Sequence, residues 1–305
     1  MPAGKALEYN LGRQRYLFVY NLGLCAGWTF ICASILFVIG QSAVAAAGAT
    51  ADRAWLTAAR TLGQWTLIPP PLRRWLCPEW TDWADPWERL AWQVTFRAVQ
   101  CFQTAALLEL LHAALVWVRA SVLVTGMQIA SRVFVVWFML TPFARELSAD
   151  GYTTLVLTWS LTETVRYAYF AVQTYAAMWM PNVRGGGSAA AVPHWLSWLR
   201  YSTFVVLYPL GVSCEMWSVW CALPLIRRSG FLRVRMPNAW NVAFDLEWLC
   251  YAVLCGYPPG LWRMYTHMLR QRTRHLGARR QREVLNEAAS KTRGASTEAS
   301  KAKRA

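Results

Sequence analysis

A phenol and a carboxylate lie seven residues apart in one apolar stretch, as Tyr208 and Glu215, with Pro209 and Gly211 between them. Seven helical residues make nearly two full turns, so both side chains face one way, about 10 Å apart along the axis. Proline can kink a helix, which would shorten that separation. A buried phenol and carboxylate on one face can act as proton donor and base. The spacing also fits a tyrosine that only packs and a glutamate that pairs with an arginine.

Other ionisable residues lie within apolar stretches, where each costs free energy and marks a candidate functional site. The pairs Glu109/His112 and Glu163/Arg166 are each three residues apart, so each pair shares a helix face. Arg132 lies in a further apolar stretch. Such groups often pair across helices and hold a bundle together, and we expect this of Glu163 and Arg166 in particular. Glu109 and Glu163 remain alternative catalytic carboxylates if the helix that carries Glu215 is rotated.

Other chemistries have weaker support. The four histidines show no metal-binding spacing and the eight cysteines include no CxxC pair, so we expect neither a metal site nor a disulfide framework. Cys221 and Arg227 match a C-x5-R phosphatase pattern, but Pro224 interrupts the stretch and no glycine-rich phosphate loop accompanies it. A transporter is suggested only by the intramembrane charges, and no inverted repeat supports it.

The elements that must position these residues are membrane-spanning helices. The chain of 305 residues is 56% hydrophobic and 15% charged, whereas soluble domains contain about 25% charged residues. The sequence therefore predicts an all-α membrane protein, a bundle of six transmembrane helices with a basic, partly disordered C-terminal tail. Each predicted span is long enough to cross about 30 Å of hydrocarbon. The six apolar runs are 16–40, 92–118, 120–141, 153–180, 198–225 and 242–266.

The predicted organisation has three parts: a cytosolic N-terminus at 1–15, a membrane domain at 16–266 and a basic cytosolic tail at 267–305. The run at 16–40 is longer than the 7–15 apolar residues or so of a signal peptide, although Ala43-Val-Ala45 mimics a cleavage site. Between the first two spans, residues 41–90 are predicted to form a loop, because prolines cluster there and its tryptophans suit a membrane interface.

Charge sets the predicted orientation. Residues 262–305 hold twelve Lys or Arg and three Glu, and so carry nine of the net +15 charges. Positive charge favours the cytosolic side, and an even number of spans places both termini there. The arginines of the 226–243 loop disagree, because six spans place that loop in the lumen. The final residues, 301–305, resemble a dilysine retrieval signal of the endoplasmic reticulum, or form an ordinary basic tail. Since the basic charge adjoins a hydrophobic span, nucleic acid is not an expected partner.

Motifs in the first five runs, and one directly after the sixth, point to one family. The segments that carry the resemblance are Tyr16–Trp28, Leu108–His112, Thr125–Trp137, Trp159–Tyr169, Leu207–Glu215 and His267–Arg272. In this order they resemble the 3-hydroxyacyl-CoA dehydratases, also called the protein-tyrosine-phosphatase-like family. Six segments in register are far more specific than any one of them. The 41–90 loop and the basic tail show no match, which leaves partners and regulation open.

The resemblance implies a lyase that dehydrates (3R)-3-hydroxyacyl-CoA to trans-2-enoyl-CoA, the third step of fatty-acid elongation at the endoplasmic reticulum membrane, without cofactor or metal. The family's catalytic Tyr and Glu correspond to Tyr208 and Glu215. With Glu215 as the base, Tyr208 would donate to the departing hydroxyl group, and the two roles can also be reversed.

The same resemblance suggests residues for substrate binding and suggests partners. The acyl tail would lie between helices, and the CoA phosphates need cations on the cytosolic side. The candidate substrate-binding residues are Arg119, Gln128, Arg132, Arg166, Tyr167 and Arg200. Arg119 and Arg200, like Arg263, also fit a plain interface anchor. The expected partners are the 3-hydroxyacyl-CoA substrate, the lipid bilayer and other elongation-cycle enzymes, and the alternative function is a non-catalytic scaffold for those enzymes.

Overall fold

The computed structural model describes residues 11–46, 86–118, 120–143, 147, 151–179 and 192–302. Every regular element in these ranges is helical, and the one strand-like feature is a bridge between Val234 and Phe244. The predicted all-α class is therefore confirmed for this part of the chain. The elements are α1 (Leu11–Ala46), α4 (Pro86–Ala105), α5 (Leu107–Ala114), α6 (Val122–Phe134), the π-helical η1 (Val135–Leu140), α8 (Tyr152–Trp179), α9 (His194–Ser202), α10 (Phe204–Ser229) and α11 (Leu246–Ala302).

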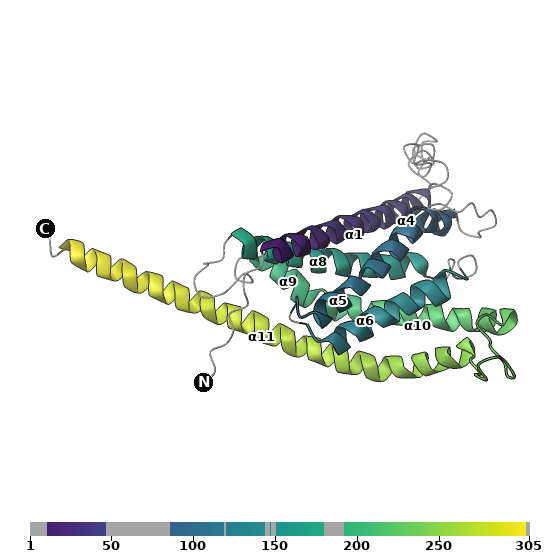
Figure 1. Ribbon diagram of the computed structural model, residues 1–305. Helices are drawn as coiled ribbons and strands as arrows, with labels where there is room; N and C mark the ends of the chain where they lie inside the picture. The colour runs from purple at the N-terminus through teal and green to yellow at the C-terminus, as the bar shows by residue number, and fades with distance from the viewer. Residues whose placement is uncertain are drawn as a thin grey trace.

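The helices pass back and forth between the two ends of an elongated bundle (Figure 1). The successive passes are α1, α4 with α5, α6 with η1, α8, α9 with α10, and the first part of α11. The start of α1 and the far end of α11 consequently lie toward the same end of the bundle. Each of the six apolar runs predicted from the sequence falls on one of these passes.

Helix α8 occupies the centre of the bundle, where it packs along α1 and also contacts α4, α9 and α10. Its buried residues include Tyr152, Val156, Trp159, Glu163 and Tyr167. They recur at intervals of three or four, so they form one stripe along the helix. This stripe turns an indole, a carboxylate and a phenol toward the interior together.

Three segments are long and apolar enough to cross a membrane among the residues that the structure describes: Leu11–Val44, Val122–Leu140 and His194–Ser229. They contain α1, α6 with η1, and α9 with α10. The other three passes are more polar or shorter in apolar length. Helix α8 carries Glu163 and Arg166 in its middle, and the pass at 92–118 is divided at Ala106 between α4 and α5. Membrane-spanning character is thus visible in half of the predicted spans by composition and length.

The C-terminal tail differs from the prediction. The basic tail at 267–305 was expected to be partly disordered, at residues 286–305, but α11 continues without interruption from Leu246 to Ala302. The helix leaves the bundle and extends beyond it (Figure 1). The physical reason is composition: the segment after Gly277 is rich in Ala, Arg, Lys and Glu, which are good helix formers.

The predicted loop at 41–90 is bounded more tightly in the structure. Helix α1 runs on to Ala46, and α4 begins at Pro86. Proline suits the first position of a helix because the amide hydrogen that it lacks would have no helical partner there. Residues 47–85 lie outside the described residues, and with them four of the five tryptophans predicted to meet the membrane interface (65, 75, 80 and 83). The fifth, Trp87, lies on α4 and packs partly buried against the core.

Candidate active site

Glu215 is buried in the bundle, with only 4% of its surface exposed, and its carboxylate contacts three other helices. The indole nitrogen of Trp159, on α8, donates a hydrogen bond to Oε1 at 3.1 Å. The hydroxyl of Tyr257, on α11, donates to Oε2 at 2.9 Å. Ser131, on α6, approaches the same carboxylate. Both oxygens therefore act as acceptors, and the side chain is fixed from two sides.

Gly211 explains how α10 comes close enough to α8 for this contact. A Cβ atom at position 211 would lie 3.3 Å from Cγ2 of Thr158 and 4.0 Å from Cδ1 of Trp159. The first distance is tighter than ordinary van der Waals contact. Because glycine has no side chain, the two helix backbones approach one turn away from Glu215, as small residues allow in membrane bundles.

Tyr208 lies on the Glu215 side of α10, as the seven-residue spacing predicts. The half-buried phenol interacts electrostatically with Glu215 and with Arg132. Helix α10 is continuous from Phe204 to Ser229 although Pro209 lies inside it. In the described part of the chain no protein group is hydrogen-bonded to the Tyr208 hydroxyl. A phenol, a carboxylate and a guanidinium thus converge on one region of the interior.

The remaining buried charges form a ladder of ion pairs beside this region. Arg132 pairs with Glu163. Arg166 contacts Glu163 through Nε at 2.7 Å and Glu109 through Nη1 at 2.5 Å. The hydroxyl of Tyr167 donates to Glu109 as well. The ladder joins α6, α8 and α5, and it confirms the prediction that Glu163 and Arg166 pair and hold helices together.

These contacts distinguish three carboxylates, of which Glu163 and Glu215 are buried and Glu109 is half-buried. Glu109 and Glu163 are each paired with arginine, so the alternative that one of them is the reactive carboxylate loses support. Glu215 instead receives hydrogen bonds from neutral donors. Arg132 links the two groups, because it pairs with Glu163 and also interacts electrostatically with Glu215. Its guanidinium carbon lies 5.8 Å from the centre of the Trp159 ring.

The other predicted substrate-binding residues are distributed more widely. Arg132, Arg166 and Tyr167 are brought together in the ladder. Gln128 is half-buried, and its backbone carbonyl accepts a hydrogen bond from Ser131, but no described contact joins its side chain to Glu215. Arg200 lies on α9, where it stacks on aromatic rings. Arg119 lies outside the described residues.

Two hydrogen-bond partners of Glu215 were missed by the sequence reasoning. Trp159 shares the buried stripe of α8 with Glu163 and Tyr167, so its spacing could have identified it. Tyr257 precedes Pro258 and Pro259 in an apolar run and carries no local signal. Only the packing of α11 against α10 brings its hydroxyl to Glu215.

The phosphatase-like pattern has no matching geometry. Cys221 and Arg227 both lie on the continuous helix α10, and Arg227 pairs with Glu247 at 2.6 Å. A phosphate-binding loop needs free backbone amides, and inside a helix those amides are occupied by helical hydrogen bonds. The described structure therefore gives the C-x5-R segment no role in phosphate chemistry.

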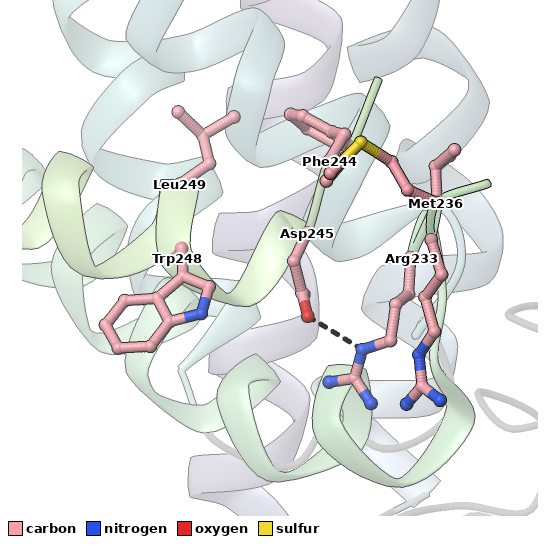
Figure 2. Close-up of a pocket in the computed structure, with 9 residues that line it drawn as sticks. Arg233, Met236, Phe244, Asp245, Trp248 and Leu249 are labelled. Atoms are coloured by element: carbon pink, nitrogen blue, oxygen red, sulfur yellow. Dashed lines mark hydrogen bonds and ion pairs between the residues drawn. The ribbon is translucent and has the colours of Figure 1, made fainter. Parts of the chain in front are cut away.

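A surface pocket at the turn between α10 and α11 is separate from Glu215. Figure 2 shows Arg233 donating to Asp245, at 2.7 Å, with Phe244, Trp248 and Leu249 beside them. The backbone amide of Glu247, and then Arg233, lower the pKa of Asp245. These contacts hold the turn in place, and none of the residues that line the pocket contacts the buried carboxylate.

Comparisons with known proteins agree with the resemblance in the sequence. The profile of the family described as "Protein tyrosine phosphatase-like protein, PTPLA" matches residues 103–278, which include Tyr208, Glu215 and Tyr257. The match begins after α1, so the resemblance of Tyr16–Trp28 stays a prediction. No solved structure matches the chain.

Curated relatives are similar over 180 residues, or 59% of this chain. Very-long-chain (3R)-3-hydroxyacyl-CoA dehydratase PASTICCINO 2A of Oryza sativa subsp. japonica is 41% identical, and PASTICCINO 2 of Arabidopsis thaliana is 39% identical, each over 76% of its own length. Very-long-chain (3R)-3-hydroxyacyl-CoA dehydratase 1 of Mus musculus is 34% identical over 59% of its length. The chain belongs to the protein-tyrosine-phosphatase-like (PTPLA) family.

Proposed function

We propose that this chain is a 3-hydroxyacyl-CoA dehydratase, a lyase that converts (3R)-3-hydroxyacyl-CoA to trans-2-enoyl-CoA and water in the third step of fatty-acid elongation. The names of its relatives support this reaction. The observation that carries the proposal is the buried carboxylate of Glu215, held by Trp159 and Tyr257 on the same side of α10 as Tyr208.

The reaction needs one base and one acid. Glu215 takes the proton from C2, and the electron pair of that C–H bond forms the C2–C3 double bond as the C3–O bond breaks. Tyr208 gives its proton to the departing hydroxyl group, which leaves as water. Transfer of a proton from Glu215 back to Tyr208 restores both groups. Glu215 suits the role of base because the hydrogen bonds from Trp159 and Tyr257 stabilise its ionised form. Among the described residues no group hydrogen-bonds the hydroxyl of Tyr208, which leaves it to the substrate.

Arg132 is suited to stabilise the charge that builds up during proton removal. Abstraction next to a thioester shifts negative charge onto the thioester oxygen, and a fixed cation in an apolar setting stabilises such charge strongly. The guanidinium of Arg132 interacts electrostatically with both Glu215 and Tyr208. Its ion pair with Glu163 fixes its orientation.

The remaining substrate contacts are assigned by position. Arg166 and Tyr167 hold the ladder behind Arg132, and Gln128 lies one turn away from Arg132 on α6. Arg200, on α9, is a cation for the CoA phosphates, and Arg119 is a second candidate from its place in the sequence. The acyl tail runs among apolar side chains between the helices, and no cofactor or metal takes part.

The six passes of the bundle are membrane spans, with both termini in the cytosol, in the membrane of the endoplasmic reticulum. Their alternating direction and the basic residues of α11 support this topology. Large apolar side chains exposed on the outside of the bundle, such as Val19, Val206 and Trp220, support contact with lipid. In this setting other elongation-cycle enzymes are partners. A glycosylation acceptor placed after Gly230 should be modified in microsomes, whereas one at residue 305 should not.

The reaction is tested with protein purified in detergent and a long-chain (3R)-3-hydroxyacyl-CoA. Native protein should form the enoyl-CoA, while Tyr208→Phe and Glu215→Gln should elute as folded protein and lose turnover. If Glu215→Gln kept near-native turnover, Glu215 would not be the catalytic base. A folded native protein that never turns over would instead favour the non-catalytic scaffold for elongation enzymes.

A further inference from the structure

Arg200 is a half-buried cation that forms no ion pair with a carboxylate among the described residues. Its guanidinium lies 4.5 Å from the ring centre of Tyr169 and 4.3 Å from that of Phe170. Its Nη1 atom is shielded from solvent and has no hydrogen-bond partner among the described residues. By contrast, Arg132 and Arg166 inside the bundle are both paired with glutamates. An unsatisfied buried donor on a charged group suggests a bound anion.

Helix α11 adds a second cation and an aromatic surface next to Arg200. Arg272 approaches Ser202, the last residue of α9, with Nε 3.5 Å from the hydroxyl. His275 stacks on Tyr201, with ring centres 4.7 Å apart and an angle of 14° between the planes. We call Arg200, Tyr201, Arg272 and His275 the α9–α11 cluster. In the described structure no carboxylate forms an ion pair with either of its arginines.

The cluster offers what a phosphorylated nucleotide requires. Two guanidinium groups can bind phosphate oxygens through charge-assisted, bidentate hydrogen bonds. The exposed side of the stacked Tyr201 and His275 offers a flat aromatic surface on which a base can stack. Acyl-CoA carries both a phosphorylated ribose and an adenine.

The position of the cluster relative to Glu215 fits the shape of such a ligand. Arg200 precedes Glu215 by fifteen residues on the nearly continuous α9 and α10, which corresponds to about 22 Å along the axis. This distance is comparable to the reach of an extended pantetheine arm. A nucleotide on the cluster can therefore place its thioester near Glu215 and Tyr208.

We infer that the α9–α11 cluster binds the nucleotide end of the acyl-CoA thioester, with phosphates on Arg200 and Arg272 and adenine against Tyr201 and His275. The inference rests on the proposed function, because it takes the substrate class from there. Anionic lipid headgroups share the phosphate chemistry but lack the adenine and the thioester arm.

Binding can be measured without turnover. Full-length protein in uncharged detergent is titrated with CoA, with dephospho-CoA and, in nanodiscs, with phosphatidylserine. The native protein should bind CoA more tightly than dephospho-CoA. Loss of one charge-assisted contact in Arg272→Gln or Arg200→Gln should weaken CoA binding about tenfold or more. The matched control is Arg274→Gln, which removes an exposed arginine of α11 and should bind CoA as the native protein does.

Steady-state kinetics separate this inference from the proposed function. Both cluster variants should raise KM for the hydroxyacyl-CoA with little change in kcat, and should leave KM unchanged for a hydroxyacyl-pantetheine that lacks the nucleotide. If Arg272→Gln turned over substrate at the native rate with an unchanged KM, the α9–α11 cluster would not bind the nucleotide, and the proposed dehydratase activity would be unaffected. If the native protein bound CoA through the cluster but showed no turnover, the nucleotide site would be supported and the proposed dehydratase activity would be refuted. Variants that lose only phosphatidylserine binding would identify a lipid site instead.

Discussion

Replacing Tyr257 with phenylalanine tests whether the carboxylate of Glu215 must be held in place. The change removes one hydrogen bond, from the Tyr257 hydroxyl to Oε2 at 2.9 Å, and leaves the ring in the core. A hydrogen bond to a charged group contributes about 1.5–3 kcal/mol. Since Trp159 still holds Oε1, we expect the lower end of this range, or about a tenfold decrease in kcat. KM should change little, because Tyr257 positions the base and does not bind the substrate.

The measurement is the initial rate of enoyl-CoA formation at saturating and at low substrate, together with the thermal midpoint in detergent. Tyr265→Phe is the matched control. It lies on the same helix and also donates to α10, at the carbonyl of Val205, but does not contact Glu215. If both variants lose the same small fraction of kcat, the effect belongs to packing between α11 and α10. The positioning role of Tyr257 would then be refuted.

Three further predictions concern the surroundings of the site. Gly211→Ala places a Cβ 3.3 Å from Thr158, so α10 should move by a few tenths of an ångström and kcat should fall several-fold, whereas Gly256→Ala, in open space, should keep the native rate. Glu163→Gln breaks the ion pairs of Glu163 with Arg132 and Arg166, and we expect a loss of about 3 kcal/mol, measured as a lower thermal midpoint in detergent. The pKa of Asp245 is lowered in the folded protein, so its contribution to stability is present above the ordinary carboxyl pKa of about 4 and is lost as the pH falls through the lowered value. Asp245→Asn should make the thermal midpoint less dependent on pH in that acidic range; an unchanged slope would contradict this.

Local spacing in the sequence was enough to predict part of the site. Tyr208 and Glu215 lie on one helix, so the 3.6-residue period decides that they face the same way. The pairing of Glu163 with Arg166 is equally local. The helical passes of the bundle could be predicted from the apolar runs, although only three of the described segments are long and apolar enough to cross a membrane. Within one helix, the chain itself fixes which side chains are neighbours.

Contacts between helices could not be predicted in the same way. Tyr257 lies 42 residues after Glu215, and their hydrogen bond depends on how α11 packs against α10. Arg166 meets Glu109 across 57 residues for the same reason. The C-terminal tail was mispredicted for a different reason. Its charge suggested disorder, but strings of Ala, Arg and Glu also have high helix propensity, and the structure has the helix.

The ladder has a role beyond holding helices together. Two arginines and two glutamates balance one another, so these groups are buried without net charge. An unpaired arginine in that position would bind Glu215 directly and compete with its role as a base. Because Arg132 forms an ion pair with Glu163, its guanidinium lies near Glu215 without forming an ion pair with Glu215 in the described structure. This arrangement leaves the carboxylate oxygens of Glu215 to neutral donors and to the substrate proton.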